Sequence, residues 1–225
     1  MRPAIFSLLS LLVFLSCENS PVKKRVLPIL GNYDLEYTTV DGEKRVDTLF
    51  HKIADFKYLN EDSVWKTNKD FKNKLWIAEF FFATCPTVCP AMNLQLKKLN
   101  QELKAYENDI QFLSFTINPK HDTPNILKRY KQKTGINAKN WTFLSGDEEA
   151  THKLGIESFL TFAGKDEESE GGYAHSGSFT LVDKEGHVRG VYRVTDLNGK
   201  VDAGEYQRMK TEILKLLNDE YNIKK

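Results

Sequence analysis

The sequence predicts one α/β domain with a central mixed β-sheet, flanking helices and an N-terminal β-hairpin extension. Two observations indicate this class. Apolar runs of strand length alternate with segments whose apolar residues recur at helical spacing, as at 76–82 followed by 86–106. Near the carboxyl end, a glycine-containing turn separates two further apolar runs, which is typical of an antiparallel hairpin.

The composition of the chain excludes several classes of protein. Of its 225 residues 40% are apolar, and there are 13 glycines, 7 prolines and three cysteines. It is therefore neither a collagen, nor a disordered chain, nor a small disulfide-stabilised protein. The 32 basic and 31 acidic residues give a net charge of +1, so we expect no nucleic-acid partner. A chain of this length can bury one substantial core.

The first residues have the features of an export and anchoring segment. An apolar run at 4–15 is too short to span a bilayer comfortably but suits a signal peptide. The run ends at Cys17 in a sequence similar to a bacterial lipobox, although Phe14 stands where leucine is commoner. We therefore expect 1–16 to be a lipoprotein signal peptide and 17–25 to be a polar tether lipidated on its first residue.

The alternative is an ordinary signal peptide followed by an incidental cysteine. With the lipid, the mature chain would be an extracytoplasmic, membrane-anchored lipoprotein of the bacterial cell envelope. Cys85 and Cys89 would then be the cysteines of the folded body, in a compartment that tends to oxidise thiols. A disulfide across a three-residue gap constrains almost no loop, so we expect the pair to serve chemistry rather than stability.

Residues 26–72 predict an extension at the N-terminal side of the domain. Asp41-Gly42 lies between the strand-like segments 37–40 and 44–50, which is a hairpin signal. We expect this extension to pack on the sheet rather than to form a separate domain.

The main domain, 73–219, begins with the aromatic-rich run 76–82, which is long enough for a buried strand. Apolar residues then recur at helical spacing and predict a helix over 86–106. A second buried strand is expected at 110–117. After it, Thr123-Pro124 supplies a cap residue followed by proline, which predicts a helix that continues to about residue 133.

The remaining elements of the main domain are shorter. We expect a strand at 141–144, a helix at 147–154, strands at 178–182 and 187–194, an amphipathic helix at 202–217 and a tail at 220–225. Residues 163–173 are rich in glycine and acid without an apolar period, which predicts a mobile surface loop. This order, β-α-β-α and then a hairpin and a helix, is that of a thioredoxin-like domain, with parallel central strands and an antiparallel edge.

Cys85 and Cys89 lie where the first strand of the main domain gives way to a helix. Free backbone N–H groups and the helix dipole lower the pKa of a thiol at such a position. We place Pro86 in the first turn and Pro90 one turn in, where it would distort the helix slightly. The spacing puts both sulfurs on one face with Cα atoms about 6.2 Å apart, so the pair suits a dithiol, a disulfide or two metal ligands.

A third ligand would have to come from one of the five histidines. His175 precedes the strand at 178–182, and in a thioredoxin-like sheet the loop entering that strand lies beside the cysteines. His121 and His187 are expected at the surface, and His51 and His152 have no supporting motif. Without this topology, His175 would more simply be an exposed or hydrogen-bonded bystander.

At these residues the chain resembles the Sco/SenC family, over about residues 51–217. The resemblance is carried by Cys85-Pro86-Thr87-Val88-Cys89-Pro90, by Asp122-Thr123-Pro124 and by His175-Ser176 followed by 181–186. It implies a membrane-tethered copper protein of thioredoxin fold that helps to assemble the dinuclear copper centre of cytochrome c oxidase. It also implies Cys85, Cys89 and His175 as the copper ligands.

Some positions depart from the family pattern. Thr87 and Ala174 stand where the family usually has aspartate, and a lipid on Cys17 would replace the usual transmembrane helix. By resemblance, the partners would be the copper-centre subunit of the oxidase and a copper donor or thiol reductant.

The ligand chemistry is compatible with this implication. Two thiolates and one imidazole form a soft set of low coordination number that suits Cu(I) and can support Cu(II). Zinc would accept the same three ligands, so the residue types alone leave it open. The disulfide form cannot hold copper in this way, so metal binding would depend on a reductant.

A second function, in a different class, would use the same Cys85 and Cys89 redox pair. A membrane-tethered thiol–disulfide oxidoreductase could keep client cysteines reduced, with Cys85 as the more reactive thiol. The commoner CxxC spacing is absent, and His175-Ser176 stands where thioredoxins have a cis-proline. A peroxidase would need an arginine near its cysteine, and none lies between residues 65 and 118. A merely structural lipoprotein would explain neither the cysteine spacing nor His175, so we rank the copper chaperone first and do not expect a classical enzyme.

Overall fold

The computed structural model describes residues 25–168 and 171–225. The expected signal peptide, Cys17 and nearly all of the tether therefore lie outside the described residues. Within the described ranges, no helix is both long enough and apolar enough to cross a membrane.

The strands and helices follow one another much as the sequence predicts. The strands are β1 Tyr33–Val40, β2 Glu43–Phe50, β3 Lys57–Asn60, β4 Trp65–Thr67, β5 Leu75–Phe81, β6 Ile110–Thr116, β7 Trp141–Ser145, β8 Ala163–Lys165, β9 Tyr173–His175, β10 Ser178–Val182 and β11 Val188–Arg193. The helices are α1 Val88–Glu102, α2 Pro124–Lys133, α3 Glu148–Lys153 and α4 Ala203–Lys215, with shorter turns at Asn68–Phe71, Lys104–Tyr106, Leu154–Ser158 and Leu216–Glu220.

Seven strands form the central sheet in the order β11-β10-β5-β6-β7-β3-β4. The three middle strands, β5, β6 and β7, are parallel, and the strands on either side of them are antiparallel. The βαβ crossovers and the final β10–β11 hairpin are therefore as predicted, and the fold is α/β with a mixed sheet. Because the middle strands are parallel, their carboxyl ends meet at one edge, where the loops that carry the chemistry gather.

Two apolar cores lie on the two faces of this sheet. Residues alternate along β5, so Ile77 and Phe81 face α1, α2 and α4, while Ala78 and Phe80 face the layer that contains α3. The large side chains between the layers are fully buried, including Trp141. This three-layer packing gives a rigid support for the loops at the carboxyl edge of the sheet.

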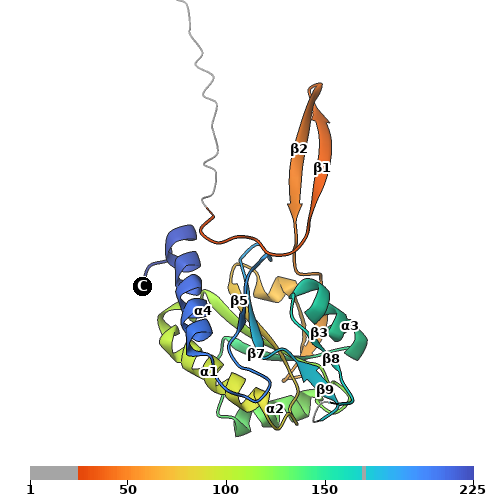
Figure 1. Ribbon diagram of the computed structural model, residues 1–225, viewed down its shortest axis with the longest axis vertical. Coiled ribbons are helices and arrows are strands. Elements are labelled where there is room, and N and C mark those ends of the chain that lie inside the picture. Colours follow the sequence, from red (N-terminus) through yellow and green to blue (C-terminus); the bar gives the residue numbers. More distant parts are fainter. Residues whose placement is uncertain (1–24, 169–170) are drawn as a thin grey trace, which may run out of the picture.

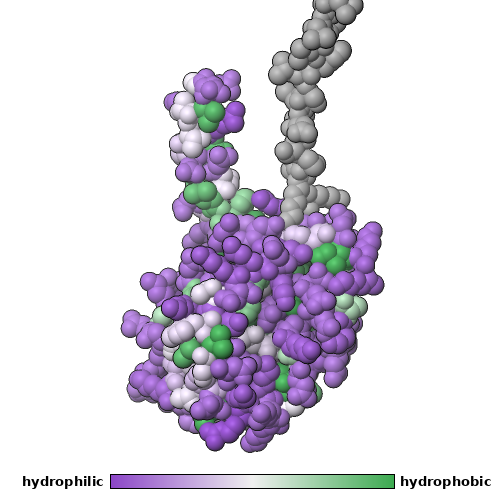
Figure 2. Space-filling view, turned by 180° about the vertical axis from the view of Figure 1, so that it is seen from behind, coloured by the Kyte–Doolittle hydropathy of each residue, from purple (hydrophilic) through white to green (hydrophobic). Residues whose placement is uncertain are grey.

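The predicted hairpin exists, but its expected packing on the sheet is wrong. β1 and β2 pair with each other and stand clear of the domain, on the side opposite β9 (Figures 1 and 2). Tyr37, in the middle of β1, is 73% exposed. Asp41 and Gly42 both have positive φ, and a two-residue turn of this conformation matches the twist of two paired strands.

Another part of the extension does join the sheet. β3 pairs with β7 and with β4, so these two short strands form one edge. The sequence prediction missed them because strands of four and three residues have too few positions for an apolar period.

The segment predicted as a loop at 163–173 is also partly ordered. Its two ends form β8 and β9, which pair antiparallel as a separate two-stranded sheet and carry His175. The sequence does not predict this pairing, because the segment is rich in glycine and acidic residues and has no alternation of apolar and polar residues. Side chains from other elements hold the two strands in place.

Candidate metal centre

Cys85, Cys89 and His175 meet at the carboxyl edge of the sheet. The Nε2 atom of His175 lies 3.1 Å from the Sγ of Cys89 and 3.7 Å from the Sγ of Cys85. The three ligand atoms lie within 4.8 Å of one another, and both cysteines are free thiols. The cluster joins residues 90 positions apart in the chain, as the predicted topology requires.

The two cysteines reach this point from different local structures. Cys89 is the second residue of α1 and is buried, whereas Cys85 lies in the turn before the helix and is half-buried. The expected helix start at residue 86 is therefore two residues early, and Pro86 is not helical. Pro90 is the third residue of α1 rather than one turn in, so its missing N–H leaves no helical hydrogen bond unmade.

The two thiols at the start of α1 differ in pKa. A hydrogen bond from the Cys89 thiol lowers the pKa of Cys85 to about 3, against the opposing effect of burial and with help from His175 and the backbone N–H groups of Cys89 and Thr87. Burial raises the pKa of Cys89 well above its usual value, and the neighbouring Cys85 adds to this. The reduced pair therefore carries one thiolate and one thiol that donates to it.

Asp122 fixes the turn that presents Cys85. Its buried carboxylate accepts a hydrogen bond from the backbone N–H of Ala83 at 2.8 Å and one from the hydroxyl of Thr116 at 2.5 Å. The side chain thus ties the turn before α1 to the end of β6. Asp122 belongs to the Asp122-Thr123-Pro124 motif, but the sequence gives no sign of this role, because it depends on a contact between two loops that are distant in the chain.

His175 is held by its strand and by aromatic packing. It pairs with Ala163 in β8–β9, and the edge of its ring faces the ring of Phe82 at 6.0 Å between centroids. Its Nδ1 atom is buried without a hydrogen-bond partner among the described residues. The polar contacts of the ring are therefore the two sulfurs, so nothing else competes for Nε2.

Two pockets open beside Cys85 and leave it accessible. One, of about 310 Å³, is lined by His175, Asp166 and Leu197, among others. The other, of about 440 Å³, runs between α1 and α2 past Leu94, which is exposed. A partner can therefore approach Cys85 while Cys89 stays covered.

A buried carboxyl group lies on the face of β5 that looks towards α1. Glu79 is 1% exposed and accepts a hydrogen bond from the Ser114 hydroxyl at 2.6 Å. Burial raises the pKa of Glu79 to about 7, although this hydrogen bond opposes the rise. Its charge also contributes to the raised pKa of Cys89.

The other histidines are held elsewhere in the described chain. His51 and His152 contact the backbone carbonyls of Ser158 and Ile117, whereas His121 and His187 each contact a neighbouring aspartate. Of the five histidines, the structure brings His175 alone to the cysteines, as predicted.

The donor set fits a soft metal ion with three ligands. For a trigonal ion with metal–sulfur bonds of about 2.3 Å and metal–nitrogen bonds of about 2.0 Å, sulfur and nitrogen should be about 3.7 Å apart. The distance from His175 Nε2 to Cys85 Sγ, 3.7 Å, already matches this value, and the distance to Cys89 Sγ, 3.1 Å, would have to lengthen by about 0.6 Å. The thiolate–thiol–imidazole set favours Cu(I), and it would release one proton from Cys89 on binding.

Comparison with known proteins gives a consistent result. A family model described as SCO1/SenC matches residues 45–209. The structure of a SCO1/SenC family lipoprotein from Bacillus anthracis is 32% identical with a TM-score of 0.64, covering 74% of this chain and 95% of that one. The structure of BsSco, described as a member of the Sco family of cytochrome c oxidase assembly proteins with a disulfide switch, is 26% identical with a TM-score of 0.61, covering 73% of this chain and 92% of that one. Copper-bound Bradyrhizobium japonicum ScoI, 20% identical with a TM-score of 0.55 and covering 70% and 97%, shows the likeness of fold alone.

Proposed function

Because the chain belongs to the SCO1/SenC family, we propose that it is a metallochaperone that binds one copper ion through Cys85, Cys89 and His175. The observation that carries this proposal is the meeting of two sulfurs and one imidazole nitrogen within 4.8 Å of one another. Copper is the cargo of the site, and its softness matches the two sulfur ligands.

The chain's own residues perform separate parts of this task. Cys85 is the half-buried thiolate, so it meets incoming metal first and is also the ligand that a partner reaches first. Cys89 gives up its proton as the ion enters, and Asp122 keeps the intervening turn in place. His175 closes the third side of the site.

We further propose that the client is the copper-centre subunit of cytochrome c oxidase. The similarity to BsSco, a member of the Sco family of cytochrome c oxidase assembly proteins, supports this choice. The open pocket between α1 and α2 provides a surface on which a protein partner could dock beside Cys85.

Thiol–disulfide exchange is a second candidate function of the same site. The observation that favours it is the lowered pKa of the Cys85 thiol beside a covered second thiol, which is the arrangement of a nucleophile and a resolving cysteine. Because a disulfide removes both sulfur ligands, the two functions are linked: a reductant restores the copper-binding form.

A copper titration of the reduced chain tests the main proposal. We expect one equivalent of Cu(I) to bind and the two thiols to become protected from alkylation together. The Cu(II) form should show sulfur-to-copper charge-transfer absorption. Uptake of zinc in preference to copper, or the absence of that absorption, would contradict the copper assignment.

We also propose that the protein is anchored outside the cytoplasm by lipid on Cys17. The lipobox-like sequence and the lipoprotein relative from Bacillus anthracis support this. Replacing Cys17 with alanine should move the protein from the membrane fraction to the soluble fraction, because a single residue would carry the acyl chains. Unchanged association with membranes would contradict the anchor.

A further inference from the structure

We propose that Glu148 is a positioning residue for the metal centre: it fastens the β8–β9 hairpin to the domain and thereby holds His175 where copper needs it. The inference rests on the proposed function of the site. It adds to the site a residue of α3, which contacts none of Cys85, Cys89 and His175.

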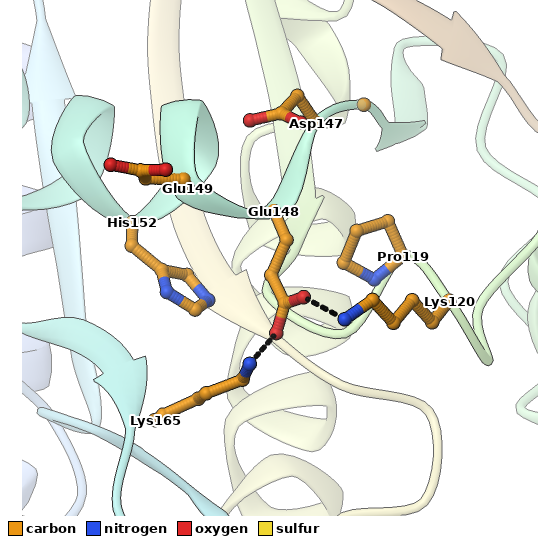
Figure 3. Close-up of a pocket in the computed structure, with 8 residues that line it drawn as sticks. Pro119, Lys120, Asp147, Glu148, Glu149, His152 and Lys165 are labelled. Carbon is orange, nitrogen blue, oxygen red and sulfur yellow. Dashed lines mark ion pairs between the residues drawn. The ribbon is translucent and has the colours of Figure 1, made fainter.

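Glu148 joins three segments that are distant in the sequence. It lies in the first turn of α3, at the side of a pocket of about 630 Å³ (Figure 3). One carboxylate oxygen accepts hydrogen bonds from the Tyr173 hydroxyl at 2.9 Å and from Lys165 at 3.0 Å. The other oxygen accepts from Lys120 at 3.0 Å, on the segment between β6 and α2. One side chain thus connects both strands of the hairpin to the body.

The hairpin has little support of its own and depends on contacts with the domain: Ala163 is buried in the core, and Glu148 supplies polar contacts to both strands. β8 and β9 have three residues each and pair only with each other among the described strands. A two-stranded hairpin of this length is not stable by itself in water. Lys165 and Tyr173 form one of its three residue pairs, and both members of that pair reach Glu148.

Fastening Tyr173 also fixes His175, two residues further along β9. Residues at this spacing lie on one side of a strand, and the Phe82 ring contacts both side chains, at 5.5 and 6.0 Å between centroids. The side-chain amide of Asn118 also lies against this hydroxyl, 3.2 Å from its oxygen, and confines it from the other side. A displacement of Tyr173 would therefore carry the imidazole away from the sulfurs.

The hydrogen bond between Tyr173 and Glu148 is present throughout the physiological pH range. Burial opposes ionisation of Glu148, but the hydrogen bonds from Lys120, Lys165 and Tyr173 outweigh it and lower its pKa to about 2. Burial and the neighbouring carboxylate raise the pKa of Tyr173 to about 12. The carboxylate thus stays charged and the phenol stays a donor, which describes a permanent fastening rather than a switch.

The exposed lysines contribute less than the tyrosine. The side chains of Lys120 and Lys165 are 77% and 59% exposed, and ion pairs in water are weak. The Tyr173 hydroxyl donates to a charged acceptor that is 14% exposed, where a hydrogen bond is stronger. We therefore expect the tyrosine–glutamate contact to dominate.

The test compares Glu148→Gln and Tyr173→Phe with Glu149→Gln in the full-length chain. Glu149 is the matched control, since it lines the same pocket on the same helix but is exposed and makes no ion pair in the described ranges. In metal-free reduced protein, amide hydrogen exchange at 163–165 and 173–176 should be about tenfold faster in the first two variants, as expected for loss of one hydrogen bond to a charged group. Their Cu(I) affinity should fall about tenfold, because the binding-competent position of His175 is less populated.

The possible outcomes distinguish a failure of this inference from a failure of the proposed function. Exchange and affinity equal to those of Glu149→Gln would overturn the role of Glu148. Faster exchange with unchanged copper affinity would overturn its link to His175. If the wild-type chain took up no copper, the proposed function would fail, while the exchange data would still decide whether Glu148 fastens the hairpin.

Discussion

Replacing Cys85 or Cys89 with serine is expected to lower the affinity of the reduced protein for Cu(I) by more than about a hundredfold, since even changes outside the ligand shell cost ten- to a hundredfold. A serine hydroxyl stays protonated at neutral pH and is a hard donor, so it does not replace a thiolate on a soft ion. Competition with a Cu(I) chelator measures the loss. The same variants should no longer form an intramolecular disulfide.

His175→Ala gives a different pattern in the same experiment. Both sulfurs remain, so we expect a smaller loss of Cu(I) affinity, loss of the native charge-transfer absorption of the Cu(II) form, and unimpaired disulfide formation. His51→Gln is the control, because His51 bonds the carbonyl of Ser158 away from the site. Unchanged copper binding in both serine variants and in His175→Ala would show that the ion is held elsewhere.

The proximity of Cys85, Cys89 and His175 could be predicted because the topology limits where these residues can lie. A βαβ unit places the residues after its first strand at the carboxyl edge of the sheet, which locates Cys85 and Cys89. The antiparallel strand β10 begins at that same edge, so the residue that enters it, His175, arrives beside them. Neither step requires knowledge of a side-chain contact, and both are confirmed by the structure.

The exact start of α1 could not be predicted from its prolines. The first backbone N–H groups of a helix have no partner within it, so proline is tolerated throughout the first turn. Pro86 before the helix and Pro90 inside its first turn satisfy this rule equally well. The difference matters chemically, because it leaves Cys85 outside the helix, where Asp122 and the Cys89 N–H set its position.

The packing of β1–β2 and of β8–β9 depended on partners far away in the sequence. Leu35 and Tyr37 alternate with acidic residues, as in a strand that is buried on one face, but the domain covers neither face. In β8–β9 the local pattern is weak, and Glu148 on α3 supplies the fastening. The local sequence indicates which strands can pair, whereas tertiary contacts determine whether a pair of strands is covered or exposed.

Arg189→Met is expected to lower the free energy of unfolding by about 3–5 kcal/mol, the usual cost of removing one partner from a buried ion pair. The Arg189 side chain is 1% exposed and donates to Asp183 at 2.9 Å and to both carboxylate oxygens of Glu220 at 2.8 Å. It also donates to the backbone carbonyls of Leu27 and Pro28, so it joins the start of the described chain to its last helical turn. Methionine keeps most of the volume but leaves two carboxylates buried without this partner.

Denaturant unfolding at pH 7 measures this effect, with the exposed Arg129→Met as control. A loss no greater than that of Arg129→Met at pH 7 would mean that the desolvation cost of the three charges offsets their attraction, and that the fold does not depend on this network.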